Sequence, residues 1–302
     1  MDCGERIIMA DQEVLRKLVS CVVYNQGYDA LDGLDPLRRL LWKDENGTVA
    51  ACLESEMDRI DGKVRAGIAS LLGARYLEIG RLDAIEELYA HEDPQVTGSV
   101  LGSLTGAPNA TPEIGPGIVA LAGKGASHPT SIVRASACRT LMNQCAWGVD
   151  VSDAIAPMLL LIEDTDAEVR QSAAYALGHF AKVKRYDLAP HIALLARGMD
   201  DGNIHVRAAA GWALWKLAGS RDIAAAVPAL VNALESSQDY DGPRKNAAGA
   251  LLSFAKKSNR NRERVIQMTT SAHLDMTKKE ISRFLLQLSA VPEDIPSDKR
   301  PG

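Results

Sequence analysis

Large aromatic and cationic side chains recur along this sequence, and their types and spacing are suited to binding another molecule. Arg139, Tyr175 and Trp212 follow one another at steps of 36 and 37 residues. Arg, Tyr, Trp and Met are enriched where proteins bind one another, whereas aromatic residues make up only 5% of this chain. The candidate partner-binding residues are Arg139, Met142, Asn143, Tyr175, His179, Trp212, Trp215 and Lys216. Their types favour recognition of another protein, and the alternative interpretation is that the rings fill gaps between packed helices.

Patterns for catalysis or cofactor binding are missing from the sequence. The six His residues form no H-E-x-x-H motif and no dense cluster with Cys or acidic residues. Neither a phosphate-binding loop, nor G-x-S-x-G, nor a dinucleotide fingerprint occurs. The acidic residues Glu163, Asp164 and Asp166 lack the spacing of a calcium loop, so helix capping explains them better. We therefore predict no catalytic residue, no metal and no cofactor.

Composition and charge narrow the class of protein. The chain has 302 residues and a formal net charge of -5, which argues against a basic nucleic-acid-binding protein. No apolar run approaches the roughly 20 residues of a membrane helix, and the N-terminus lacks the apolar core of a signal peptide. Five Cys residues without C-x-x-C fit reduced thiols. These features predict a cytoplasmic protein without a membrane segment.

The candidate residues must be positioned by an internal repeat. The template V-R-x-x-A-x-x-x-L is clearest from Val133, Val169 and Val206, and weaker copies begin at Val64, Val96 and Pro243. Positions one, five and nine of each copy are small or apolar, which is the spacing of one helical face. Position seven, which carries Arg139, Tyr175 and Trp212, points away from that face. We expect these three side chains to form a row where consecutive repeats stack.

A second predicted helix precedes most copies, and a short acidic turn joins the two. The preceding helices carry a Pro near their expected start, namely Pro116, Pro157, Pro190 and Pro228. Pro is tolerated in a first helical turn because that N–H has no intrahelical partner. The turns are expected at residues 163–168, 199–203 and 236–242, where Asp and Asn can cap the second helix. Asp166 and Asp61 each precede the repeat Arg by four residues.

The helix pair with Pro in the first helix, Asp in the turn and V-R opening the second resembles HEAT repeats. The segment AAYALG at 173–178 is similar to the short bacterial repeats named after phycobilisome lyases. The resemblance implies an all-α fold, an α-α superhelix of HEAT or armadillo type, whose second helices line its concave surface. It departs from the family pattern at Thr97, which stands in the Arg position, and at Pro243, which stands in the Val position.

The resemblance and the pattern together predict four parts. Capping helices are expected over 1–45, the repeat solenoid over 46–258, with second helices starting near 64, 96, 133, 169, 206 and 243, further capping helices over 259–290, and a disordered tail over 291–302. Residues 46–59 fit either the first cap or the Val64 unit. Since solenoid repeats cannot bury their apolar faces alone, the units must stack to form a continuous core.

The leading interpretation of function is a non-catalytic scaffold or adaptor that binds another protein on the concave face. One alternative, implied by the lyase-type repeats, is attachment or chaperoning of a bilin near Tyr175 and His179. A second alternative is a DNA-binding or alkyl-base glycosylase-like HEAT protein that uses Trp212, Trp215 and the basic stretch at 256–264. The negative net charge argues against the second alternative. His91–Glu92 is one His-Glu pair, which is too few ligands for the di-iron site of the HEAT-like deoxyhypusine hydroxylases.

Overall fold

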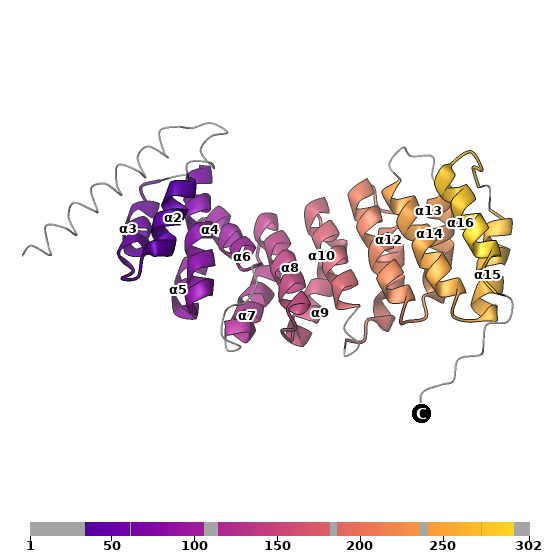
Figure 1. Cartoon of the computed structure of the whole chain (residues 1–302), viewed down its shortest axis with the longest axis horizontal. Coiled ribbons are helices and arrows are strands. Elements are labelled where there is room, and N and C mark those ends of the chain that lie inside the picture. The colour runs from indigo at the N-terminus through magenta and orange to yellow at the C-terminus, as the bar shows by residue number, and fades with distance from the viewer. Residues whose placement is uncertain are drawn as a thin grey trace, which may run out of the picture. The chain divides into compact units, whose positions relative to one another are not determined.

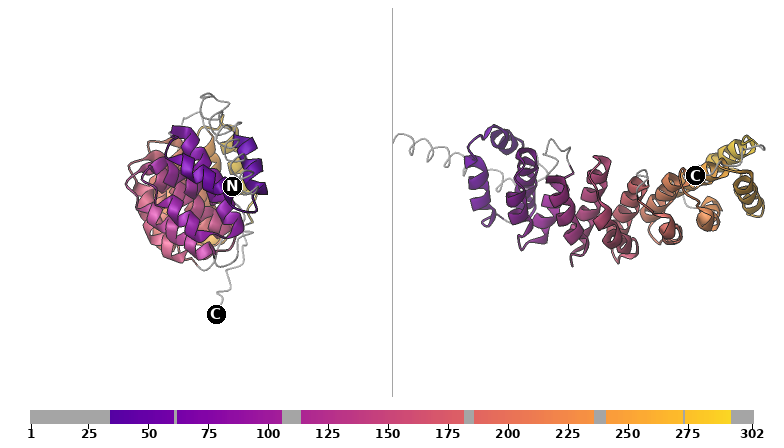
Figure 2. Two further views of the ribbon diagram at one scale, coloured as in Figure 1. Left: turned by 90° about the vertical axis from the view of Figure 1, so that its left-hand side faces the viewer. Right: turned by 90° about the horizontal axis from the view of Figure 1, so that it is seen from below.

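The computed structural model describes residues 34–60, 62–105, 114–181, 186–235, 241–272 and 274–292, and no strand occurs in these ranges. Contacts within the chain divide it into two compact units, one ending at Asp150 and the other beginning at Val151. The helices of each unit are drawn in Figure 1 and from two further directions in Figure 2.

The first unit is a stack of helical hairpins in two layers. The second helices of successive hairpins pack on one another in one layer, and the first helices do so in the other. Its helices are α2 (Leu34–Lys43), α3 (Thr48–Met57), α4 (Gly62–Ile79), α5 (Leu82–Tyr89), α6 (Pro94–Ser103), α7 (Ile114–Ala126) and α8 (Ser131–Ala146). Helix α4 packs on α6 and α6 packs on α8, while α5 packs on α7 in the second layer. Helix α3, which covers most of residues 46–59, packs on both α2 and α4.

The second unit repeats this two-layer arrangement. Its helices are α9 (Ser152–Leu160), α10 (Ala167–Phe180), α11 (Ile192–Gly198), α12 (Ile204–Ala218), α13 (Val227–Glu235), α14 (Gly242–Ala255), α15 (Asn259–Thr270) and α16 (Lys279–Ser289). Helices α10, α12, α14 and α16 lie side by side in that order, and α11, α13 and α15 form the other layer. Short 3-10 segments join some helices, namely η2 (Leu161–Glu163), η3 (Ala189–His191) and η4 (Ala224–Ala226).

The apolar face predicted from the repeat forms the core of both units. The residues at position five and at position nine of all six copies are buried, and so are those at position one except Val64, which is half-buried. Position five is Ala in the four later copies: Ala137, Ala173, Ala210 and Ala247. Because Ala has no side chain beyond Cβ, the two helices of one hairpin can approach closely there: Ala137 of α8 lies beside Gly125 of α7, and Ala210 of α12 lies beside Gly198 of α11.

Two of the three acidic turns cap their second helices as expected, whereas Asp241, at the start of α14, makes no side-chain capping hydrogen bond. The carboxylate of Asp166 accepts hydrogen bonds from the backbone N–H groups of Glu168 and Val169, at 2.8 and 3.4 Å. Asn203 accepts from the N–H of His205 at 2.8 Å, and Asp93 accepts from the N–H of Gln95 at 2.9 Å. Each cap satisfies a donor that the first helical turn leaves without an intrahelical partner.

One proline lies elsewhere than the pattern predicts. Pro116 and Pro228 stand in the first turns of α7 and α13, and Pro190 stands in η3 just before α11. Pro157, in contrast, is the sixth residue of α9, because that helix begins at Ser152. The expectation that Pro marks a helix start is therefore wrong for this repeat, where Pro157 removes a hydrogen bond inside a short helix.

Several predictions fall outside the described residues. These are the helices expected before residue 34, the acidic turn at 236–240, Asp61, and all of the expected tail from 293 onward. In the described ranges, no helix combines the length and the apolar character that crossing a membrane requires.

Candidate partner-binding surface

Helix α8 carries the three candidate residues of the first unit. Arg139, Met142 and Asn143 are all half-buried. Arg139 donates to the hydroxyl of Ser136 at 3.2 Å, and Asn143 donates to the carbonyl of Arg139 at 2.9 Å. These bonds hold both polar side chains along their own helix, with part of each side chain accessible to solvent.

In the second unit, Trp212 of α12 is the centre of an aromatic cluster. Its ring centroid lies 5.5 Å from that of Tyr175 at an interplanar angle of 61°, which is an edge-on contact. The His179 ring lies 4.9 Å from it at 44°. All three side chains are half-buried, so each packs on its neighbours and also presents part of its ring to solvent.

Two glycines let the indole rings of α12 lie on the neighbouring helices. A Cβ at Gly178 of α10 would meet Trp212 Cζ3 at 2.4 Å and the backbone Cα of Ala213 at 2.9 Å. A Cβ at Gly249 of α14 would meet Trp215 Cε2 at 2.7 Å. Trp212 therefore lies against α10 and Trp215 lies against α14, at distances that no larger residue in place of either glycine permits.

Lys216 lies near both indole rings. Its Nζ is 5.3 Å from the ring centroid of Trp212 and 4.9 Å from that of Trp215, which is within cation–π range. Trp215 is 38% exposed, and its indole Nε1 donates to the hydroxyl of Ser253 on α14 at 3.1 Å. We call Tyr175, His179, Trp212, Trp215 and Lys216 the aromatic row.

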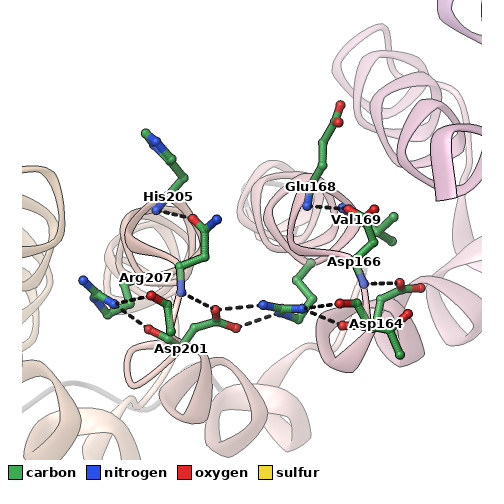
Figure 3. Close-up of polar contacts among 11 residues, drawn as sticks. Asp164, Asp166, Glu168, Val169, Asp201, His205 and Arg207 are labelled. Atoms are coloured by element: carbon green, nitrogen blue, oxygen red, sulfur yellow. Dashed lines mark hydrogen bonds and ion pairs between the residues drawn. The ribbon is translucent and has the colours of Figure 1, made fainter.

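A ladder of Arg and Asp residues positions the second helices from their turns. Arg170 donates from Nη1 to the carbonyls of Asp164 and Thr165, at 2.8 and 3.1 Å. The same guanidinium donates from Nε and Nη2 to the carboxylate of Asp201 in the next turn, at 2.7 and 2.9 Å. Figure 3 shows Asp164 and Asp201 in these consecutive turns, together with Arg207.

Asp166 and Asp201 have different roles in this ladder. Asp166, four residues before Arg170, caps α10, and the hydrogen-bonded carboxylate that pairs with Arg170 belongs to Asp201. Hydrogen bonds from the guanidinium of Arg170 lower the pKa of Asp201, although burial of the carboxyl group acts in the opposite direction. Asp201 in turn raises the pKa of Arg170. The bidentate pair thus fixes α10 and α12 relative to each other.

The ladder also exists in the first unit in altered form. Arg65 donates to the carbonyls of Met57 and Ile60, and its Nη1 reaches the carboxylate of Asp93 at 3.3 Å. Thr97, which replaces the repeat Arg, is buried and its hydroxyl donates to the carbonyl of His91 at 3.2 Å. The Thr97 side chain therefore bonds to the turn that precedes its own helix.

The other residues considered for chemistry make structural contacts. His91 Nδ1 accepts from the backbone N–H of Asp93 at 2.9 Å. Lys257 and Arg262 of the basic stretch donate to the carbonyls of Arg221 and Val291, at 3.0 and 3.1 Å. Cys138 and Cys145 are buried. Over the described ranges, no group of three or more His, Cys, Asp or Glu side chains is arranged to hold a metal ion.

Reasoning from the sequence did not identify Gly178, Gly249 or Ser253 as parts of the surface. The sequence does contain a pattern that indicates the two glycines. Gly178 stands at position ten where the next repeat has Trp215, and Gly249 stands at position seven where the preceding repeat has Trp212. The exchange of large and small residues between positions seven and ten of adjacent repeats is what side-by-side packing of their helices requires.

Comparison with known proteins agrees with this architecture. Residues 155–253 match the family model of HEAT repeats. An engineered protein is 19% identical over 94% of this chain and 86% of its own, with a TM-score of 0.60. A designed armadillo repeat protein is 18% identical over 70% of this chain and 100% of its own, with a TM-score of 0.56.

The fold is that of a HEAT- or armadillo-like α-solenoid, as the repeat predicts. A further designed armadillo repeat protein, solved in complex with the peptide (KR)4, is 18% identical over 73% of this chain and 99% of its own, with a TM-score of 0.51. No curated protein matches the sequence. The HEAT match is centred on the second unit and includes the helices that carry the aromatic row.

Proposed function

We propose that this protein is a non-catalytic scaffold that binds another protein through the aromatic row. The observation that carries the proposal is that Tyr175, Trp212 and Trp215 pack on one side against neighbouring helices and remain partly exposed on the other. Rings held in this way lose little conformational entropy on binding, which is one reason why aromatic residues dominate interface energetics.

The repeat architecture supports this function. Designed armadillo repeat proteins of similar fold include one solved with a bound peptide, and repeat solenoids in general present extended preformed surfaces. In the second unit, the Arg170–Asp201 pair and the two glycine contacts hold α10, α12 and α14 in place. A partner would thus meet a surface that needs little reordering. Arg139, Met142 and Asn143 of α8 are proposed as separate partner-binding residues of the first unit.

The proposal is tested by comparing variants in a capture experiment. Tyr175→Ala and Trp212→Ala are expected to keep the helical circular dichroism of the wild-type chain and to lose a specific partner protein that the wild type captures. Since truncation of a hot-spot aromatic costs about 2 kcal/mol or more, binding should fall by about 30-fold or more.

Leu160→Ala is the matched control, because Leu160 of α9 is a large apolar residue that is 77% exposed and lies outside the proposed partner-binding residues. It should capture the partner as the wild type does. Unfolding of Tyr175→Ala and Trp212→Ala, or equal capture by all variants, would show that the rings serve packing alone.

A further inference from the structure

The last helices of the second unit form a groove with an unusual charge. It has a volume of about 560 Å³ and lies between α14 and α16, with Trp215 of α12 as one wall. That volume is in the range of pockets that hold small ligands or a few side chains. Its charged lining consists of Lys245, Lys256, Lys279, Arg283 and Glu280. Four cations and one carboxylate give this basic groove a net charge of +3, whereas the whole chain carries -5.

Among the described residues, carboxylates pair with few of these cations. Lys245 lies 3.8 Å from the carboxylate of Asp241. In the part of the chain that the structure describes, Lys256, Lys279 and Arg283 have no carboxylate within ion-pair distance. All four cationic side chains are exposed. Like charges that gather without counterions repel one another, so an anion that enters the groove gains a favourable interaction with several of them.

The position of one lysine does not serve the stability of its helix. Lys279 is the first residue of α16, and the residue before it, Lys278, makes no side-chain capping hydrogen bond. A cation at a helix N-terminus is disfavoured by the helix dipole. A bound carboxylate would interact favourably with both the ammonium group and the helix end.

The groove also has apolar surface beside the cations. Phe284, which is buried, lines the α16 side, and Leu252 and Ala248 line the α14 side. Trp215, held by its hydrogen bond to Ser253, connects the groove to the aromatic row. A ligand that matches this lining has an apolar side chain flanked by carboxylates.

We propose that the basic groove binds an extended acidic segment of the partner protein, with carboxylates at Lys256, Lys279 and Arg283 and an apolar side chain against Trp215 and Phe284. This rests on the proposed function, because the groove continues the aromatic row through Trp215. A nucleic acid fits less well, because phosphate backbones are bound along a continuous positive stripe and the net charge of the chain is negative.

The test is a titration of the full chain with short labelled peptides, followed by fluorescence anisotropy. One peptide alternates Asp and Glu around a single Leu, a second has Lys in place of every acid, and a single-stranded oligonucleotide is the third probe. The acidic peptide should bind, and its affinity should fall between about 50 and 200 mM salt because the contacts are ionic. The basic peptide should not bind.

Charge-reversal variants distinguish binding in the groove from attraction of the peptide by the net charge of the whole protein. The double variant Lys279→Glu with Arg283→Glu should weaken the acidic peptide about tenfold or more. Arg260→Glu with Arg264→Glu changes the net charge by the same amount at two exposed residues of α15 outside the groove lining, and it should retain the affinity within about twofold. All four residues are exposed, so both variants are expected to fold.

Three outcomes would overturn the inference: no binding of the acidic peptide, equal weakening by both double variants, or tighter binding of the oligonucleotide. The proposed function is judged separately. If Tyr175→Ala abolishes capture of a partner while the Lys279→Glu, Arg283→Glu variant captures it normally, only the groove assignment fails. If capture never depends on Tyr175 or Trp212, the proposal that the aromatic row binds a partner is wrong. The peptide titration then still tests whether the basic groove binds an acidic segment.

Discussion

At the residue scale, the contacts that join α12 to its neighbours each place a large aromatic ring against a glycine. Trp212 lies over Gly178 and Trp215 over Gly249, so α12 contacts both of its neighbours through indole rings. The rings are partly exposed because they lie on the outer side of the second helices, opposite the Ala and Leu face. The rings of Tyr175 and Trp212 therefore pack on neighbouring helices and also keep part of their surface exposed to solvent.

The glycine contact can be tested directly. Gly178→Ala is expected to lower the free energy of unfolding by about 1–3 kcal/mol, because the new methyl group must displace both the Trp212 ring and the backbone at Ala213. Chemical denaturation measures the change. Gly123→Ala in α7 is the control, because a Cβ there meets nothing within 4 Å. That variant should be unchanged or up to about 1 kcal/mol more stable, from helix propensity. Equal effects of the two substitutions would contradict the stacking argument.

At the element scale, each second helix is positioned by its apolar face and by its turn. The Arg170–Asp201 pair joins residues 31 apart in sequence, with Asp201 only 12% exposed. The pKa of Asp201 lies below its usual value of 3.8, chiefly because Arg170 donates two hydrogen bonds to the carboxylate. A carboxyl group whose pKa is lowered by folding stabilises the folded state above its unfolded pKa, and that stabilisation is lost as the pH falls through the folded pKa.

Asp201→Asn should therefore be destabilised by about 1–2 kcal/mol at neutral pH, since a hydrogen-bonded charge is replaced by an amide. The difference from the wild type should shrink as the pH falls below about 4, where the wild-type carboxylate is itself becoming protonated. Urea denaturation at several pH values measures it. Asp200→Asn, at the exposed neighbour, should stay within about 0.5 kcal/mol of the wild type. A difference for Asp201→Asn that is constant with pH would show that the charge is not responsible.

At the scale of the whole molecule, the chain forms two compact units that meet in sequence between Asp150 and Val151. Each is built from helical hairpins that contact mainly their neighbours. Stability in such solenoids is approximately a sum of repeat and neighbour terms, so local damage is expected to remain local.

Leu214→Ala in the second unit and Leu72→Ala in the first remove fully buried side chains, and each should cost about 2–5 kcal/mol. Amide hydrogen exchange is the measurement. Leu214→Ala should accelerate exchange mainly from Val151 onward, and Leu72→Ala mainly before it. Equal acceleration along the whole chain after either substitution would mean that the protein unfolds as one cooperative body.

The sequence by itself determined the helix pairs, their buried faces and their capped turns. Those features depend on residues close together in the chain: Val, Ala and Leu at steps of four define one helical face, and Asp or Asn just before it caps the helix. The candidate residues Tyr175 and Trp212 followed from the same geometry, because position seven is opposite the buried face.

The tertiary structure alone decided which side chains from different repeats meet. Arg170 bonds to Asp201 although Asp166 is closer in sequence, Trp212 and Trp215 lie on glycines of two other helices, and α16 completes a basic groove that no repeat copy contains. These contacts depend on the rotation and spacing of neighbouring helices, which packing of whole side chains sets and which the period of a single helix does not encode.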